Sequence, residues 1–360
     1  MPISAVDIIS PAFQHTKQQL LKPFRFGQWV RLALLGLATG ELGSSGSCRF
    51  NVPSLPQRQP SSENLVSAVP HMPPSLSHLS MVQLILVVAV AVLFFAIIMV
   101  LFIYLNSICR FILFDSILKR ECRLREGWRQ WRPAGRRFFV WQLLFQVVVL
   151  MGFVILIGLP LGFAYLAGWF TRPKEHLAPL ILGGILLFFV LIAFTLCILL
   201  VHVIAKDFVV PLMALEDLDW REAWERCLAM LKGEKGGYSA YLGMKALLAI
   251  AASIVLGVIG FIIAFIFILP VVLAFLIPTA RAGHGVTWNV YTITLAVVVG
   301  TVVFVFLICL ISLMSVPVVV FFPAYAIYFF AARYPALSLR LYGPPPPPPI
   351  LPSMPAPLPT

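Results

Sequence analysis

Residues 81–105 read MVQLILVVAVAVLFFAIIMVLFIYL, an apolar stretch without a single charged side chain. A helix needs about 20 mostly apolar residues to cross the hydrocarbon core of a bilayer. This stretch is therefore predicted to be a membrane-spanning helix. Four further segments meet the same criterion, and a sixth, shorter candidate carries Arg31; in chain order these five are Phe26–Gly40, Phe138–Phe170, Leu177–Ala205, Leu242–Pro278 and Trp288–Val316.

The whole chain of 360 residues has the same apolar character. It is 61% hydrophobic and 11% charged, with a mean hydropathy of +0.97, whereas soluble domains are about 45–50% apolar and about 25% charged. The excess apolar surface must face lipid, which excludes a soluble protein. We expect an all-α fold, a polytopic helical membrane bundle of about six spans. Pro160 and Pro270 are expected to bend or end the helices that contain them.

The basic residues indicate which side of the membrane each loop occupies. Nine Lys and Arg lie in residues 106–137 and six in 206–245. Counted over alternate connecting segments, 21 fall on one side and five on the other. Lys and Arg accumulate on the cytoplasmic side, so both termini are predicted to be cytoplasmic in a plasma membrane, which for a bacterium is the inner membrane.

The domain organisation follows from these segments. Residues 1–340 are predicted to form a single helical membrane domain, within which 41–80 is an irregular external loop rich in Ser and Pro. Residues 341–360 contain six consecutive prolines and are predicted to be a proline-rich, disordered cytoplasmic tail.

Two predicted cytoplasmic segments share a pattern. Phe111–Leu118 reads FILFDSIL and is followed by REGW at 125–128, whereas Phe208–Leu215 reads FVVPLMAL and is followed by REAW at 221–224. A weaker third copy precedes the first apolar run, and the last span ends in a similar VVVFFP at 318–323. The chain is therefore predicted to consist of three hairpin-like repeats.

An amphipathic helix is expected after each shared segment. In the second copy, Asp219 and Glu222 form a capping-box pattern, and apolar residues then recur at helical spacing opposite a charged face. Such helices lie along the inner leaflet, with basic side chains toward anionic headgroups. The candidate lipid-interface residues are Arg125, Trp128, Arg129, Trp220, Arg221 and Trp224.

The blocks FILFDSIL…REGW and KDFVVPLMALEDLDWREAWERCLAMLKGEKGGY, with KPFRFGQWVRLALLG near the start, resemble bacterial integral membrane proteins of unknown function. These are related to the membrane domain that accompanies some glycerophosphoryl diester phosphodiesterases. The resemblance covers most of residues 10–340. It implies a helical membrane domain in the bacterial inner membrane and no particular activity.

Ionisable residues near the predicted spans are few. His202, Lys206 and Asp207 cluster where one span ends on the cytoplasmic side. One interpretation is an ion- or proton-responsive gate, because charge is costly in lipid. The other is an ordinary helix end, where Lys206 and Asp207 pair with each other at the interface. Lys245 is expected to extend to the headgroups.

The patterns typical of catalysis and metal binding are missing from the sequence. The six cysteines form no C-x-x-C, and the histidines do not fall at metal-ligand spacing. We therefore predict no catalytic residue, no metal and no cofactor. The net charge of +12 is an excess on one face of the membrane, which indicates the lipid bilayer and its anionic headgroups as partner and not nucleic acid.

Three functions remain open. The first is a non-enzymatic scaffold or an envelope or assembly component. The alternative is a small-molecule or lipid transporter with a site between the repeats. A third is a membrane-embedded lipid enzyme that uses residues near 202–207. A membrane-protein partner and a homo-oligomer are both left open.

Overall fold

A computed structural model describes residues 4–22, 24–41, 81–169, 176–281 and 290–342. Within these residues the chain forms helices and no strands, which confirms the all-α fold class. The helices are α1 (Ile9–Leu21), α2 (Phe26–Thr39), α4 (Met81–Lys119), α5 (Leu124–Leu166), α6 (Leu177–Ile204), a π-helical turn (Ala205–Val209), α7 (Val210–Glu216), α8 (Trp220–Gly233), α9 (Lys235–Arg281), α10 (Val290–Met314), α11 (Val316–Ala331) and α12 (Pro335–Tyr342). The tail from 343 and the loop at 42–80 lie outside the described residues.

Five of these helices are long and apolar enough to cross a membrane. They are Val82–Lys119, Leu124–Leu166, Leu177–Glu216, Lys235–Ala274 and Tyr291–Met314. The chain is thus a membrane protein with five candidate spans in the described residues, where the sequence indicated about six. The sixth predicted span, Phe26–Gly40, instead forms the short helix α2. Its 14 residues measure about 21 Å, less than the about 30 Å of a hydrocarbon core.

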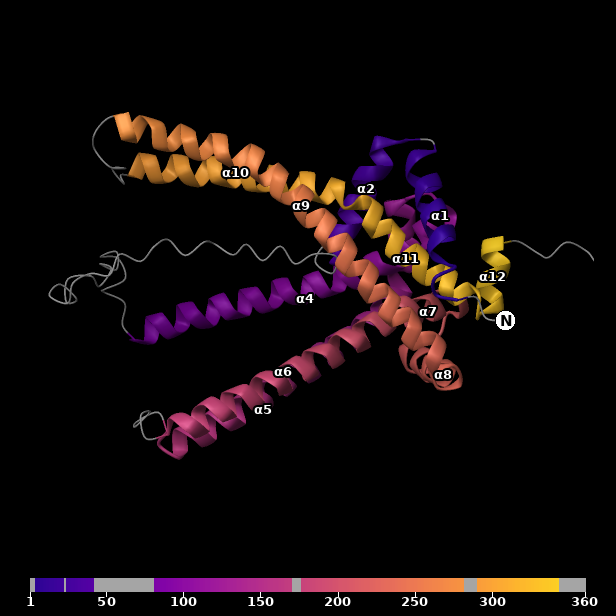
Figure 1. Ribbon diagram of the computed structural model, residues 1–360, viewed down its shortest axis with the longest axis horizontal. Coiled ribbons are helices and arrows are strands. Elements are labelled where there is room, and N and C mark those ends of the chain that lie inside the picture. The colour runs from indigo at the N-terminus through magenta and orange to yellow at the C-terminus, as the bar shows by residue number, and fades with distance from the viewer. Residues whose placement is uncertain (1–3, 23, 42–80, 170–175, 282–289, 343–360) are drawn as a thin grey trace, which may run out of the picture.

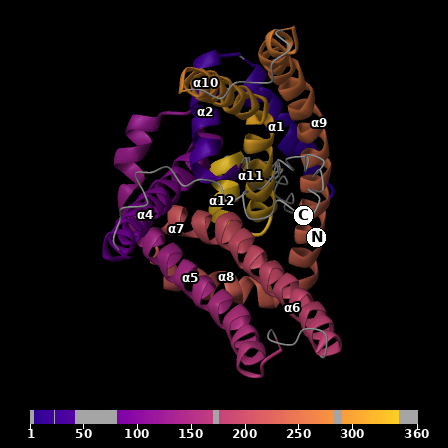
Figure 2. The ribbon, with the colours of Figure 1, turned by 90° about the vertical axis from the view of Figure 1, so that its left-hand side faces the viewer.

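The long helices extend from one compact end of the molecule as three legs (Figure 1). The legs are the outer parts of α4, of the α5–α6 pair and of the α9–α10 pair, and they end at separate places when viewed end-on (Figure 2). Over the most apolar 18 residues of each candidate span, between 0% and 6% of residues are buried. The legs therefore expose most of their apolar side chains.

The compact end, which we call the core, contains α1, α2, α7, α8, α11, α12 and the inner parts of the long helices. Its buried residues include most of the two repeated segments, Phe111–Leu118 and Phe208–Leu215. Phe111 of α4, Phe208 of the π-helical turn and Phe329 of α11 are almost completely buried. The rings of Phe208 and Phe329 lie 6.1 Å apart between centroids. These aromatic residues hold the three legs together at one end.

The prolines of the long helices lie inside them and do not end them. Pro160 lies inside α5 and Pro270 inside α9, and neither helix ends there. Pro133 also lies inside α5, so residues 124–132 form the first turns of this long helix instead of a separate interfacial helix. Pro133 and Arg129 are exposed. The carbonyl that loses its helical hydrogen bond to proline can therefore be solvated by water.

Candidate functional site

The local backbone places Lys206 and Asp207 on different sides of one helix. Pro211 has no N–H and its ring would clash with the carbonyl of residue 207 in a regular α-helix. The chain instead forms the π-helical turn just before it, in which the N–H of Val210 donates to the carbonyl of Ala205, five residues earlier. A π-turn widens the helix locally and is frequent at functional sites.

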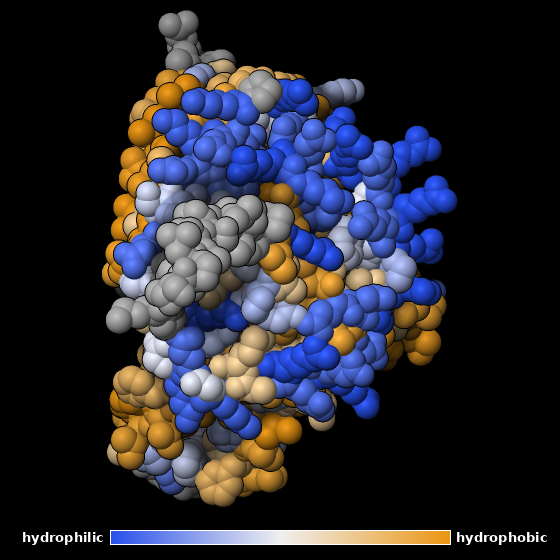
Figure 3. Space-filling model, turned by 90° about the vertical axis from the view of Figure 1, so that its right-hand side faces the viewer, coloured by the Kyte–Doolittle hydropathy of each residue, from blue (hydrophilic) through white to orange (hydrophobic). Residues whose placement is uncertain are grey.

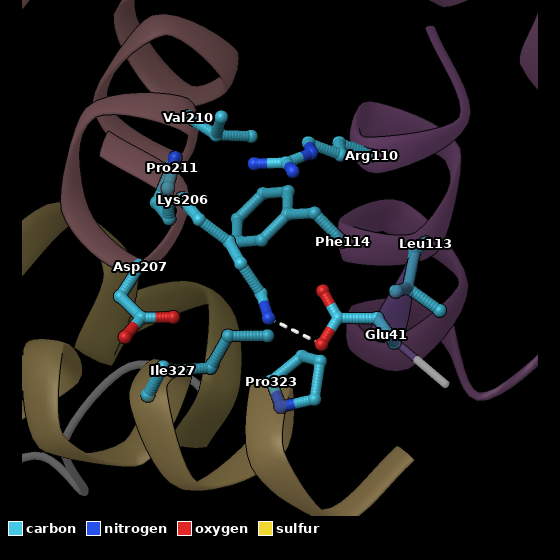
Figure 4. Close-up of a pocket in the computed structure, with 11 residues that line it drawn as sticks. Glu41, Arg110, Leu113, Phe114, Lys206, Asp207, Val210, Pro211, Pro323 and Ile327 are labelled. Atoms are coloured by element: carbon cyan, nitrogen blue, oxygen red, sulfur yellow. Dashed lines mark hydrogen bonds and ion pairs between the residues drawn. The ribbon is translucent and has the colours of Figure 1, made fainter. Parts of the chain in front are cut away.

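Each of these two residues pairs with a different helix. The ammonium group of Lys206 forms an ion pair with Glu41, just after α2, as Figure 4 shows. The carboxylate of Asp207 pairs with Lys245 of α9 and accepts a hydrogen bond of 2.9 Å from the hydroxyl of Tyr241. Glu41, Asp207 and Lys245 are all buried. Two ion pairs thus join the end of α2, the π-helical turn and α9 inside the protein.

Arg110 brings α4 into the same group of residues. Its Nε donates to Asn106 Oδ1 at 2.8 Å, and its Nη2 lies 2.8 Å from Nε2 of His202. The Nδ2 of Asn106 in turn donates to the carbonyl of Ala38 in α2 at 3.2 Å. Arg110 is 6% exposed, and its Nη1 has no hydrogen-bond partner among the described protein groups.

We call this group the polar cluster. Its members are Glu41, Arg110, His202, Lys206, Asp207, Tyr241 and Lys245. A small cavity of about 30 Å³ adjoins it, between α4, the π-helical turn, α7 and α11 (Figure 4). The charged residues that line this cavity are Glu41, Arg110, Lys206 and Asp207, and its remaining wall is largely apolar.

Among the described residues, the polar cluster presents neither a free general base nor a set of metal ligands. Each carboxylate of the cluster is engaged by a lysine, so neither is placed as an unencumbered general base. No group of three or more His, Cys, Asp or Glu that could hold a metal ion occurs within the described ranges.

Comparison with known proteins places the chain in a family. Residues 3–340 match the model of a family of unknown function, DUF7544. The chain belongs to this family. No curated protein and no solved structure matches it. Membership in DUF7544 agrees with the resemblance to membrane proteins of unknown function, and it leaves the relation to the phosphodiesterase membrane domain as a prediction.

The polar cluster contains the three residues that the sequence singled out. His202, Lys206 and Asp207 all belong to it, but Lys206 and Asp207 do not pair with each other at a helix end as one interpretation had it. Lys245 does not extend to the headgroups, because it is buried against Asp207. Glu41 and Arg110 were not among the predicted site residues.

The aromatic members of the proposed lipid-interface set pack against protein. Trp224 lies on Trp141, with ring centroids 5.6 Å apart, and Trp128 lies on Tyr104 at 6.4 Å. Trp220 is half-buried against the core.

The basic members of the set lie nearer the surface. Arg125, Arg129 and Arg221 are exposed, and the guanidinium of Arg221 lies 5.1 Å from the centroid of the neighbouring Trp220 ring. Asp219 precedes α8 at its N-cap, without the predicted side-chain hydrogen bond to the helix.

Proposed function

We propose that this chain is a non-enzymatic scaffold of the bacterial inner membrane, which holds other membrane helices against its legs. The observation that carries the proposal is the exposure of the legs. Val92, Leu93, Phe94 and Phe95 are consecutive on α4, so they point in four directions, and each is between 61% and 67% exposed. A span whose apolar faces are all open presents its whole circumference to lipid or to a partner helix.

Small residues on the legs support the same proposal. A Cβ atom added at Gly158 or Gly162 of α5 would meet nothing within 4 Å among the described residues. These glycines form a G-x-x-x-G spacing, which permits close approach of a second helix in a membrane. In contrast, Gly36 of α2 already packs against Val319 of α11.

A transporter is the second candidate function. Transporter sites lie near the bilayer midplane between repeats that pack against each other. Here the three legs are apart from one another at that depth, and packing is seen within the α5–α6 and α9–α10 pairs, as between Phe153 and Phe194 and between Phe267 and Phe306. One observation favours transport, namely that the polar cluster combines residues of α4, α6 and α9 beside a cavity. The cavity of about 30 Å³ has room for one or two water molecules, too little for most solutes.

The remaining parts of the proposal concern symmetry, orientation and lipid contact. Each leg, with the core segment that follows or precedes it, corresponds to one of the three hairpin-like repeats. The core faces the cytoplasm, with both termini on that side. Exposed Arg125, Arg129 and Arg221 contact anionic headgroups there. The relation to the membrane domain of glycerophosphoryl diester phosphodiesterases belongs to the same proposal.

A photo-crosslinking experiment tests the scaffold function. Benzoylphenylalanine is placed singly at the four positions 92–95 of the full-length chain, in native membranes and in lipid nanodiscs of the purified protein. Because the four side chains are almost equally exposed, the isolated chain is expected to give the same kind of adduct at each of the four positions. A partner helix is expected to give protein crosslinks from one or two adjacent faces in native membranes, and lipid adducts from all four in nanodiscs.

Two outcomes would overturn the proposal. Lipid adducts from all four positions in native membranes would mean that no protein partner covers α4. Crosslinks from α4 to the chain's own α6 or α10 in nanodiscs would mean that the legs close into a packed bundle, which would favour the transporter.

A further inference from the structure

The outward face of α2 is apolar, although this helix is too short to cross a membrane. Phe26, Leu34 and Leu37 recur at helical spacing, and their side chains are 63%, 55% and 42% exposed. The opposite face, which contains Leu32 and Leu35, is buried in the core. An exposed apolar surface of this kind is typical of a region that binds a membrane or another protein.

The turn that leads into α2 continues this apolar surface. Leu21 and Phe24 are 53% and 59% exposed, and the turn lies at the outer edge of the core in both ribbon views (Figure 1 and Figure 2). In α1 the polar side chains of His15 and Gln19 are buried, whereas Phe13 is 62% exposed. We call the exposed apolar residues of this region the apolar corner, which consists of Phe13, Leu21, Phe24, Phe26, Leu34 and Leu37.

Basic side chains accompany the apolar corner. Three of them are exposed and form no ion pair with another described residue, namely Lys17, Lys22 and Arg25. Residues 4–40 contain a single acidic side chain, Asp7. In the neighbouring turn after α4, Glu121 and Glu126 both pair with Arg123. The three basic side chains are therefore available to attract a negatively charged surface.

Contacts with α4 indicate the depth of α2 relative to the candidate spans. Asn106 directly follows the uncharged stretch 81–105, and its Nδ2 donates to the carbonyl of Ala38 at 3.2 Å. Near the other end of α2, Nε2 of Gln28 donates at 3.0 Å to the carbonyl of Arg120, in the charged turn after α4. α2 also runs across the direction of the legs in both ribbon views (Figure 1 and Figure 2). A helix between the end of a span and a charged turn lies at the depth of the bilayer interface.

We propose that the apolar corner binds the surface of the membrane leaflet next to the core. The rings of Phe24 and Phe26 lie among the headgroups, and Leu34 and Leu37 face the acyl chains. The three basic side chains contact the phosphates of anionic lipids.

A bilayer surface accounts for both kinds of exposed side chain, because it presents an apolar interior directly beneath negatively charged phosphates. The arginines of α5 and α8 lack such exposed aromatic neighbours, since Trp128 and Trp224 pack against protein. The inference does not rest on the scaffold function, because the apolar corner belongs to the core and not to the legs.

Spin-label accessibility in the full-length chain tests the proposal. A nitroxide is attached to Phe26→Cys or Leu34→Cys in a background without native cysteine, and Glu222→Cys at an exposed position of α8 is the control. The chain is placed in nanodiscs of phosphatidylcholine alone, or of equal parts of phosphatidylcholine and anionic phosphatidylglycerol. Molecular oxygen concentrates in lipid and a nickel chelate in water. The oxygen-to-nickel accessibility ratio in anionic nanodiscs is expected to be highest at position 34, intermediate at 26 and lowest at 222.

Two triple variants separate contact with anionic lipid from a change in total charge. Each replaces three exposed basic residues by Gln, either Lys17, Lys22 and Arg25 beside the apolar corner or Lys232, Lys235 and Arg340 elsewhere in the core. The wild-type ratio at position 26 is expected to rise from neutral to anionic nanodiscs. The first variant should lose this rise, and the second should keep it.

Water-exposed labels would overturn the proposal. Ratios at positions 26 and 34 that equal the ratio at 222 in anionic nanodiscs would mean that the apolar corner faces water. If benzoylphenylalanine at position 24 also crosslinked to a second protein in native membranes, the corner would be a protein-docking surface instead. A rise that persists without Lys17, Lys22 and Arg25 would contradict their contact with anionic lipid.

Discussion

At the scale of single residues, His15 joins three helices of the core. Its Nδ1 lies 3.2 Å from the hydroxyl of Tyr328 in α11, and its Nε2 lies 3.1 Å from the carbonyl of Ile117 in α4. The carbonyl can only accept, so Nε2 donates and Nδ1 accepts from the tyrosine, which describes a neutral imidazole. Burial, followed by the positive charge of Arg120, lowers the pKa of His15 from its ordinary value of 6.5.

The lowered pKa of His15 makes the stability of the core depend on pH. The unfolded chain takes up a proton below pH 6.5 while the folded chain does not, so the free energy of unfolding is highest above that pH and decreases as the pH falls. One such group contributes up to about 1.4 kcal/mol per pH unit. Thermal unfolding between pH 7.5 and 5.5 should show a steeper loss for wild type than for His15→Gln. Parallel curves would contradict this role of His15.

At the scale of helices, α4 and α5 cross where glycine allows close contact. A Cβ atom at Gly135 of α5 would lie 2.6 Å from the side chain of Ile108 in α4 and 3.1 Å from its Cα. Gly135→Ala is therefore expected to lower the free energy of unfolding by about 1–3 kcal/mol, because backbone atoms must move.

Another glycine of α5 provides the matched control for this crossing. Gly158 faces open space among the described residues, so Gly158→Ala should leave stability unchanged or raise it by up to about 1 kcal/mol through helix propensity. Denaturant unfolding in detergent measures both variants. Equal effects on stability would mean that the crossing is not tightly packed.

The helices also show which features the sequence could predict. The start of α8 at Trp220 follows from the charge and apolar pattern after Asp219, and the span that begins at Met81 follows from composition alone. Pro270 did not end α9, because a long apolar helix is stabilised along its whole length in lipid, where unpaired backbone groups are costly.

The polar cluster was only half predictable, for a different reason. His202, Lys206 and Asp207 stand out because charge is rare near a span. The pairing of Asp207 with Lys245 depends on which helices meet in the core, and no local pattern contains that information. Glu41 was assigned to the external loop at 41–80, because it directly follows the apolar run, yet it is buried against Lys206.

At the scale of the whole molecule, polar side chains gather on the face opposite the leg tips. Figure 3 shows that face as largely hydrophilic, with apolar residues toward its edges. The start of α5, with its exposed arginines, and α8 lie at this end, whereas Leu166 and Tyr291 lie at the outer ends of their legs and are 86% and 85% exposed. The positive-inside rule then predicts that the core faces the cytoplasm.

The native cysteines cannot report this orientation cleanly. Cys122 and Cys227 lie on the core side but are buried, and burial raises the pKa of the Cys122 thiol to about 11 and that of Cys227 to about 12. Since the thiolate is the reactive form, both should be unreactive from either side of the membrane. Exposed positions must therefore carry the reporter thiols.

Four single cysteines in a background without native cysteine supply that test. Glu126→Cys and Glu222→Cys lie at exposed positions of the core side, and Leu166→Cys and Tyr291→Cys at the leg tips. In intact cells, a membrane-impermeant maleimide is expected to label only the two leg-tip variants, and permeabilisation should expose the other two. The reverse pattern would invert the topology. Labelling of one residue from each pair would contradict the arrangement itself, because all three legs extend from the same side of the core.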